Sequence, residues 1–273
     1  MHRRIFVAAV LAAALGAVAA AQQNRIDVVS PLAPELASYG TFAIGVRTLQ
    51  VTDKHRPDIL NTKEGGATAF YDRTLTLEAW YPAALASGQQ PGGEYRTITR
   101  DPSIAVTLHG KAVRDAVPLS TGGPFPLVII SHGYPGNRFL LSHMGENLAS
   151  KGFVVVSIDH RDSTYDDQKA FASTLYNRPF DQLFVLNEVA RLTAAGSGSF
   201  LSGIVDATRA GIVGYSMGGY GVVNVLGGGY SKNAWYAQYL SIRHLLETYG
   251  MPREQVAAQV LQYLEQKGLL PST

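Results

Sequence analysis

Apolar and polar residues alternate in the first part of the chain. One face of the stretch Phe42–Val51 is mostly apolar, and Leu75–Tyr81 repeats the alternation until Pro82 ends it. A period of two is typical of strands that bury one face, so we predict a strand in each stretch. The polar residues 54–66 predict a loop between them. Residues 83–124 hold many Gly, Pro and Ser residues and predict a long surface excursion with short edge strands.

After Pro126 the apolar runs become short and unbroken, which is typical of strands buried on both faces of a parallel sheet. These runs cover residues 127–130, 153–158 and 210–214. Apolar residues at helical spacing follow each run, over residues 140–151, 179–195 and from Met217 onward. In the second of these helices the predicted apolar face consists of Phe180, Leu183, Phe184, Val189 and Leu192. The alternation of strands and helices predicts an α/β fold with a mostly parallel sheet and flanking helices.

The pattern changes again near the end of the chain. Two stretches at helical spacing cover residues 233–249 and 252–267, and Pro252 stands at a favourable first helical position. No further buried strand is indicated after residue 230. We therefore predict a helical hairpin over residues 231–273 in place of later strands.

The first 21 residues have the pattern of a secretory signal peptide. Arg3 and Arg4 precede an apolar run from Ile5 to Val18, and small residues follow at 19–21. The alternative is a membrane anchor, but the run is shorter than the roughly 20 apolar residues that a spanning helix needs. This pattern predicts a secreted or periplasmic protein with no stable membrane span after cleavage.

Composition narrows the function classes. The chain of 273 residues is 46% apolar and 16% charged, and it contains no cysteine. This excludes a disordered chain, a disulfide scaffold, a cysteine-ligated metal site and a thiol nucleophile. Lys and Arg total 23 and Asp and Glu total 21, and two of the basic residues lie in the leader. A mature chain without excess charge predicts no nucleic-acid partner.

The strongest chemical motif is Gly214-Tyr-Ser-Met-Gly-Gly219, which follows an apolar strand and opens a helix. This is the G-x-S-x-G pattern of a nucleophile elbow in its required context. The turn at Ser216 is so sharp that side chains two positions away would collide, and Gly214 and Gly218 remove those collisions. The helix N-terminus beside Ser216 favours negative charge.

A second loop supports the same chemistry. Residues 131–136 (Ser-His-Gly-Tyr-Pro-Gly) follow the first buried strand, where acyl-transfer hydrolases place one oxyanion-hole N–H. The residue after the nucleophile supplies the other donor. The expected donors are thus the backbone N–H groups of Tyr134 and Met217. For the His132 side chain we expect a structural role within the loop.

These motifs identify a family. The stretch Phe125–Asp162, Arg178-Pro179 before a long helix, and the elbow together resemble the platelet-activating-factor acetylhydrolase and lipase-like branch of the α/β-hydrolases. The resemblance covers about residues 40–230. It implies an α/β-hydrolase fold, Ser216 as nucleophile and a small-molecule or lipid ester as substrate, with no cofactor. Dienelactone hydrolases have a similar pattern but use a cysteine, which this chain lacks.

The catalytic base is harder to assign. In this fold the acid and the histidine follow the serine, yet the residues after Met217 contain no Asp, three Glu and one histidine, His244. His244 is the candidate base, with Glu247 three residues on as a partner on the same helix face. The alternative pair Asp159 and His160 precedes the serine, and there we favour hydrogen bonding at a strand end. His143 and Glu146 lack a third ligand, so we expect no metal site.

Two interpretations remain open for the whole chain. The first is an exported serine hydrolase of carboxylic esters, with an incomplete α/β-hydrolase domain over residues 22–230. The second is a catalytically inactive, shortened scaffold that acts as a binding protein or remnant. Missing strands leave a sheet edge exposed, which favours association into a homo-oligomer under either interpretation.

Overall fold

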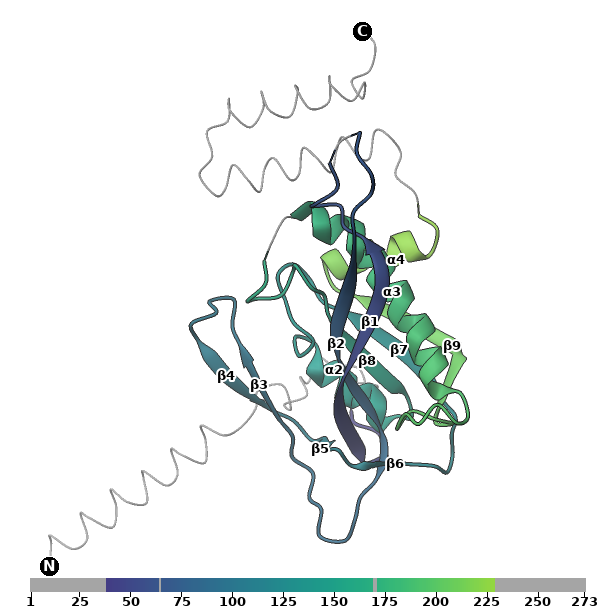
Figure 1. Ribbon diagram of the computed structural model, residues 1–273. Coiled ribbons are helices and arrows are strands. Elements are labelled where there is room, and N and C mark those ends of the chain that lie inside the picture. Colours follow the sequence, from purple (N-terminus) through teal and green to yellow (C-terminus); the bar gives the residue numbers. More distant parts are fainter. Residues whose placement is uncertain (1–37, 64, 169–170, 229–273) are drawn as a thin grey trace, which may run out of the picture. The chain divides into compact units, whose positions relative to one another are not determined.

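The computed structural model describes residues 38–63, 65–168 and 171–228, and all its labelled elements belong to one unit that ends at Val225 (Figure 1). The strands are β1 Ile44–Pro57, β2 Phe70–Ala84, β3 Glu94–Ile98, β4 Ala105–His109, β5 Val113–Arg114, β6 Val117–Pro118, β7 Phe125–Ser131, β8 Val154–Asp159 and β9 Val205–Gly214. The helices are α2 Ser142–Ser150, α3 Phe171–Thr193 and α4 Met217–Val225. The predicted signal peptide at 1–21 and the predicted helical hairpin at 231–273 lie outside the described residues.

The main sheet is mixed and confirms the predicted α/β class. Its strands follow the order β5-β1-β2-β8-β7-β9, with β6 paired to β2. In the first half β5 runs parallel to β1, and β2 runs antiparallel to β1, β6 and β8. The second half is parallel, since β7 runs with both β8 and β9. Strands β3 and β4 form a separate small sheet within the predicted surface excursion.

Both faces of the central strands are covered, as the unbroken apolar runs predicted. Along β7, Leu127 and Ile129 join a core cluster that includes Val185 of α3. The alternate residues Val128 and Ile130 join the cluster on the opposite face, against α2. Because successive side chains of a strand point to opposite faces, helices on both sides require apolar residues at every position.

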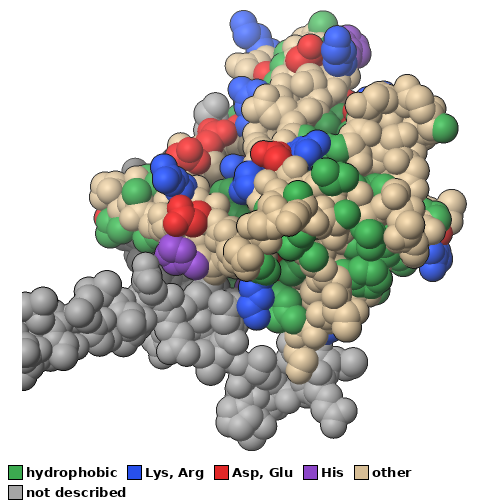
Figure 2. All heavy atoms as spheres, turned by 90° about the horizontal axis from the view of Figure 1, so that it is seen from below, with side chains coloured by type: hydrophobic (Ala, Val, Ile, Leu, Met, Phe, Trp, Pro, Cys, Tyr) green, Lys and Arg blue, Asp and Glu red, His purple; other side chains and the backbone are tan. Residues whose placement is uncertain are grey.

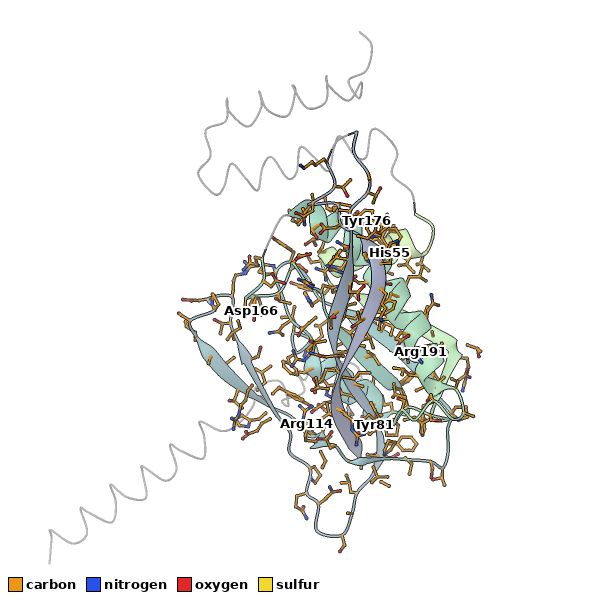
Figure 3. All side chains as sticks on the ribbon, viewed as in Figure 1. His55, Tyr81, Arg114, Asp166, Tyr176 and Arg191 are labelled. Carbon is orange, nitrogen blue, oxygen red and sulfur yellow. The ribbon has the colours of Figure 1, made fainter. Side chains whose placement is uncertain are left out.

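The hairpin of β1 and β2 is longer than the sequence pattern predicts. The predicted loop over residues 54–66 is wrong at its start, because β1 continues to Pro57 and pairs with Phe70 after a bulge. The His55 ring stacks on Phe70 at 3.9 Å, which adds an apolar contact where the sequence looks polar. Figure 3 shows His55 near this end of the hairpin and Tyr81 at the other.

Helix α3 begins at Phe171, eight residues before the predicted start at Pro179. A proline inside a helix has no N–H for the carbonyl four residues earlier. Here that carbonyl belongs to Leu175, and it accepts a hydrogen bond from the Tyr220 hydroxyl of α4 at 3.1 Å. The side chain of a neighbouring helix thus replaces the missing backbone donor, and the helix continues through Pro179.

The predicted apolar face of α3 is also partly wrong. Phe180 and Leu183 are exposed, whereas Val189 is buried as predicted. The buried face of the first half is polar and consists of Ser173, Thr174, Asn177, Arg178, Asp181 and Gln182. Buried charges persist in proteins when they are paired and hydrogen-bonded, and Asp181 meets that condition through the contacts described below. Within the described residues, three buried polar atoms of this face have no hydrogen-bond partner: Thr174 Oγ1, Arg178 Nε and Gln182 Oε1.

Strand β9 is confirmed as a strand, but not as one buried on both faces. Residues 208–211 are exposed, and among the described residues β9 pairs only with β7. It therefore forms an edge of the sheet as far as the structure describes it. The pairing with β7 is interrupted, because Pro126 pairs with Asp206 and Leu127 with Ala210, so three residues of β9 bulge out.

On the face drawn in Figure 2, basic and acidic side chains are interspersed, and neither sign forms a continuous area. In the part of the chain that the structure describes, no helix is both long enough and apolar enough to cross a bilayer.

Candidate active site

Ser216 lies in the turn between β9 and α4 and is exposed. Its backbone is left-handed, with φ of +52°, a conformation that non-glycine residues adopt at a cost. A Cβ at Gly214 would lie 2.3 Å from the Gly218 carbonyl carbon, and a Cβ at Gly218 would lie 2.0 Å from the Ser131 carbonyl oxygen. Only glycine fits at both positions, as the motif predicts.

The loop after β7 lies directly beside this turn. A Cβ at Gly133 would lie 3.3 Å from the Ser216 Cβ, so the backbone of the loop passes next to the serine side chain. The ring of Tyr134 packs edge-on against Phe171 at 5.0 Å. The structure thus brings the loop that carries Tyr134 together with Ser216 and Met217, the three residues that the sequence grouped as nucleophile and oxyanion donors.

The predicted base is not placed. His244 and its predicted partner Glu247 lie outside the described residues. Within the described residues, no hydrogen bond joins the Ser216 hydroxyl to a histidine. Asp159 accepts hydrogen bonds from Arg138 at the end of β8 and does not pair with His160.

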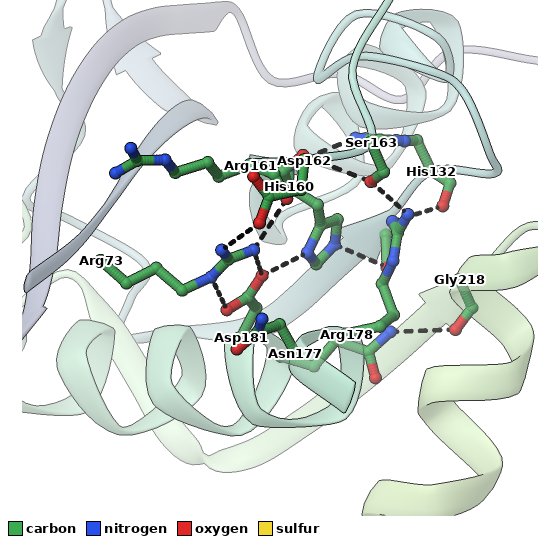
Figure 4. Close-up of polar contacts among 12 residues, drawn as sticks. Arg73, His132, His160, Arg161, Asp162, Ser163, Asn177, Arg178, Asp181 and Gly218 are labelled. Atoms are coloured by element: carbon green, nitrogen blue, oxygen red, sulfur yellow. Dashed lines mark hydrogen bonds and ion pairs between the residues drawn. The ribbon is translucent and has the colours of Figure 1, made fainter. Parts of the chain in front are cut away.

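His160 instead belongs to a buried chain of polar contacts (Figure 4). Its Nδ1 lies 3.0 Å from Asp181 Oδ2, and its Nε2 lies 2.8 Å from Ser131 Oγ. Because a carboxylate only accepts hydrogen bonds, Nδ1 carries the proton, and Nε2 accepts the Ser131 hydroxyl. Burial, followed by the charge of Arg178, lowers the pKa of His160 to about 3, so the ring is neutral at pH 7.

Asp181 is the centre of this cluster. Arg73 donates from Nε to Oδ1 at 2.8 Å and from Nη2 to Oδ2 at 2.9 Å, and Arg56 donates from Nη1 to Oδ1 at 3.2 Å. Burial alone would raise the pKa of Asp181, but Arg73 and the hydrogen bond from His160 outweigh burial and hold it well below its usual value. The carboxylate is therefore charged and paired on both sides. We name Ser131, His160, Asp181, Arg73 and Arg56 the buried polar cluster.

His132 stabilises the loop after β7, as the sequence interpretation expected. Its Nε2 accepts a hydrogen bond from the His160 backbone N–H at 3.3 Å, so the proton lies on Nδ1, which donates to the Gly133 carbonyl at 2.7 Å. Burial, with the nearby Arg178 charge, lowers the pKa of His132 well below its usual value. The ring is therefore neutral, and its two nitrogens have opposite roles.

The remaining polar candidates show no metal site in the described residues. Glu146 is buried and accepts hydrogen bonds from the backbone N–H groups of Lys111 and Ala112, while His143 is exposed. Among the residues that the structure describes, no group of three or more His, Asp or Glu side chains is arranged to hold a metal ion.

Sequence reasoning missed three residues that support the site: Arg178, Asp181 and Gln182 of α3. Gln182 donates from Nε2 to the Gly218 carbonyl at 2.9 Å, and Arg178 reaches the loop after β7. The spacing of Asn177 with Asp181 and of Arg178 with Gln182 places two polar pairs four residues apart on one helix face. This spacing is the sequence signal from which the polar face of α3 could have been predicted.

Comparison with known proteins gives evidence on the family of this chain that is independent of the geometry of the site. A family model described as PET hydrolase-like matches residues 86–231, more than half of the chain. The platelet-activating factor acetylhydrolase of Cavia porcellus is 45% identical over 65 residues, which is 22% of this chain and 15% of that protein. Cutinase est1 of Thermobifida alba is 30% identical over 98 residues, 36% of this chain and 29% of the cutinase.

A solved structure agrees with these matches. The ferulic acid esterase of Streptomyces cinnamoneus superposes with a TM-score of 0.51 at 29% identity, over 70% of this chain and 57% of the esterase. The chain therefore spans less than two thirds of the length of each of these three proteins.

Proposed function

Because the chain belongs to the PET hydrolase-like family of α/β-hydrolases, we propose that it is a serine hydrolase that cleaves carboxylic esters through an acyl-enzyme on Ser216. The names of the matched proteins, an acetylhydrolase, a cutinase and an esterase, support an ester as substrate. The substrate is a small-molecule or lipid ester, and the leader at residues 1–21 exports the chain.

The observation that carries this proposal is the backbone of Ser216. A serine held at φ +52° costs free energy that the fold must supply elsewhere, and such conformations cluster at active sites. The same turn leaves the side chain exposed at the start of α4. There it can reach the carbonyl carbon of an ester, which a buried hydroxyl cannot.

Two backbone donors and one histidine complete the proposed machinery. The N–H groups of Tyr134 and Met217 stabilise the oxyanion, and each such donor typically contributes about 10²–10³ in turnover. His244 is the proposed base, because it is the one histidine after Ser216 and the fold places its histidine there. A hydroxyl needs such a base, since it is a weak nucleophile at its own pKa.

The alternative is an inactive scaffold that binds esters or other partners. It is supported by the missing contact between Ser216 and any histidine of the described residues. An elbow without its base retains about 10³–10⁴ of rate over water through the oxyanion hole and binding. Activity therefore has to be compared with that residual level and not with zero.

The test is labelling of the purified full chain by a fluorophosphonate, with p-nitrophenyl butyrate turnover in the same samples. We expect Ser216→Ala to abolish labelling and to lower turnover to that residual level. Ser131→Ala is the matched control, because Ser131 has a histidine partner but is completely buried, and we expect it to keep labelling. Labelling that survives in Ser216→Ala, or its absence from the folded wild-type chain, contradicts the proposal.

The base is tested separately. His244→Ala is expected to lower turnover to the residual level of an elbow without a base, with little effect on substrate affinity. His160→Gln serves as comparison, since His160 is buried and bonded on both ring nitrogens. Equal turnover in wild type and His244→Ala, measured on folded protein, would remove His244 from the mechanism.

A further inference from the structure

The guanidinium of Arg178 lies beneath the loop after β7 and bonds its carbonyl groups. Arg178 is 1% exposed and reaches the loop from the middle of α3. It donates from Nη1 to the His132 carbonyl at 2.8 Å and from Nη2 to the Gly133 carbonyl at 3.3 Å. Nη2 also donates to Ser163 Oγ at 2.7 Å, which anchors the guanidinium on its other side.

The Gly133 carbonyl accepts a second hydrogen bond, from His132 Nδ1 at 2.7 Å. Both lone pairs of this oxygen are therefore occupied by buried donors of the protein interior. Burial lowers the pKa of Arg178 to about 9, so the guanidinium still carries its charge at neutral pH. Charge-assisted hydrogen bonds are typically short, and the shorter bond from Arg178 to the loop is the one to the His132 carbonyl, whereas His132 makes the shorter bond to the Gly133 carbonyl.

The direction of this carbonyl determines the direction of a neighbouring N–H. The bond between Gly133 and Tyr134 is trans, since the described cis bonds are at other positions. In a planar trans peptide the carbonyl and the N–H of the next residue point in opposite directions. Holding the Gly133 oxygen toward Arg178 therefore turns the Tyr134 N–H away from the interior. A Cβ at Gly133 would lie 3.3 Å from the Ser216 Cβ, so this peptide group lies beside the nucleophile.

We propose that Arg178 and His132 are positioning residues that orient the Tyr134 N–H as an oxyanion donor by holding the Gly133 carbonyl. This inference rests on the proposed function, because it names what keeps one donor of that reaction in place. Neither side chain touches the substrate. Each acts through the peptide group between Gly133 and Tyr134.

The second donor is held by the backbone of α4. The Met217 N–H shares its peptide group with the Ser216 carbonyl, which accepts a hydrogen bond from the Tyr220 N–H at 3.2 Å. One helical turn beyond Arg178, Gln182 bonds the Gly218 carbonyl of the same turn. Helix α3 thus contacts both segments that carry a donor, through two residues of its buried polar face, Arg178 and Gln182.

The experiment compares Arg178→Met with Arg56→Met in the full chain. Arg56 is a buried arginine that bonds Asn177 and Asp181 of α3, but its described contacts do not include the loop after β7. Arg178→Met is expected to lower kcat for p-nitrophenyl butyrate by about 10- to 100-fold, with KM changed by less than about twofold. Fluorophosphonate labelling of Ser216 should slow by a similar factor. Arg178→Lys, which keeps one charged donor, is expected to restore part of the loss.

Arg56→Met is expected to change kcat by less than about threefold, measured well below the melting temperature of each variant. Equal losses in both variants, or a higher KM at unchanged kcat in Arg178→Met, would overturn the inference. Either result would mean that Arg178 acts on overall stability or on substrate binding.

Hydrogen exchange distinguishes a failure of this inference from a failure of the proposed function. We expect peptides covering residues 131–137 to exchange several-fold faster in Arg178→Met and at the wild-type rate in Arg56→Met. If the wild-type chain is neither labelled nor active, the proposed function fails, and faster exchange still supports the role of Arg178 in holding the loop. Unchanged exchange in Arg178→Met overturns that role whether the chain is active or not.

Discussion

Ser131 and Ser216 lie at the ends of neighbouring parallel strands, yet their surroundings are opposite. Ser131 ends β7 and pairs in register with Gly214, two residues before Ser216. The Ser131 hydroxyl has His160 at 2.8 Å, but the residue is completely buried. Ser216 is exposed on a left-handed backbone and has no described histidine bonded to it.

The comparison shows that hydrogen-bond distances alone would select Ser131 as the nucleophile in place of Ser216. Ser131, His160 and Asp181 satisfy the spacing of a catalytic triad, and Ser216 does not within the described residues. A base works best when its pKa lies near the working pH, whereas burial, followed by the Arg178 charge, lowers the pKa of His160 to about 3. The buried polar cluster therefore stabilises the fold, and the exposed turn is where a substrate can react.

The largest expected effect comes from breaking the buried polar cluster at its centre. Asp181→Asn removes the fully buried carboxylate that Arg73 and Arg56 share, and leaves each arginine only its second carboxylate partner, Asp162 for Arg73 and Asp53 for Arg56. Removing one partner of a buried ion pair typically costs about 3–5 kcal/mol. We expect a loss of this size in the free energy of unfolding, measured by urea titration of Trp fluorescence.

The matched control is Asp115→Asn, at an ion pair with Arg47 on the surface. Asp115 has a left-handed backbone that Asn also tolerates, so the change removes only the charge. Exposed pairs contribute at most about 1 kcal/mol. Losses of the same size in the two variants would mean that Asp181 contributes no more than a surface carboxylate.

A smaller effect is expected from adding a methyl group at Gly218, in the first turn of α4 and beside the backbone of Ser131. Gly218→Ala places a Cβ 2.0 Å from the Ser131 carbonyl oxygen, a backbone atom that cannot rotate away. Overpacking of this kind costs about 1–3 kcal/mol. We expect that loss in urea unfolding, together with loss of fluorophosphonate labelling, because the turn at Ser216 has to shift.

Gly211→Ala on β9 is the control for this change. No described atom lies within 4 Å of a Cβ at Gly211, so a change of less than about 0.5 kcal/mol is expected. A loss comparable to that of Gly218→Ala would show that side chains pack on this face of β9 in solution. That result would contradict the assignment of β9 as an exposed edge strand.

The sequence predicted the serine turn and the strands that build it, for a physical reason. Gly214 is required by backbone contacts within a few residues, so a local motif contains that information, whereas the atom that excludes a side chain at Gly218 is the Ser131 carbonyl oxygen of β7. The burial of β9 was predicted wrongly, because an apolar run indicates only that a strand can be covered and not that a neighbour covers it. The described residues supply no partner beyond β7.

The polar face of α3 could not be predicted from apolar spacing. Arg178 and Asp181 are buried because their partners come from distant parts of the chain, such as the carbonyl of His132 and the guanidinium of Arg73. Pro179 led to the wrong prediction of where α3 begins, because a proline normally marks the first turn of a helix. Here Tyr220 supplies the missing donor from α4, a contact that no local pattern contains.

The smallest expected effect concerns pH and tests whether the histidine beside Ser131 is neutral in the fold. Burial and the nearby Arg178 charge hold the pKa of His160 at about 3, and the same causes hold the pKa of His132 well below its usual value. The unfolded chain takes up these protons near pH 6.5, so stability is complete above that pH and falls on acidification. Each histidine contributes up to about 1.4 kcal/mol per pH unit to this fall.

We measure the free energy of unfolding by urea titration at pH 7.5, 6 and 5. In His160→Gln we expect it to fall less steeply with pH, by the contribution of one histidine. The same slope in His160→Gln and in wild type would mean that His160 binds its proton equally in both states, and that the buried polar cluster opens to water.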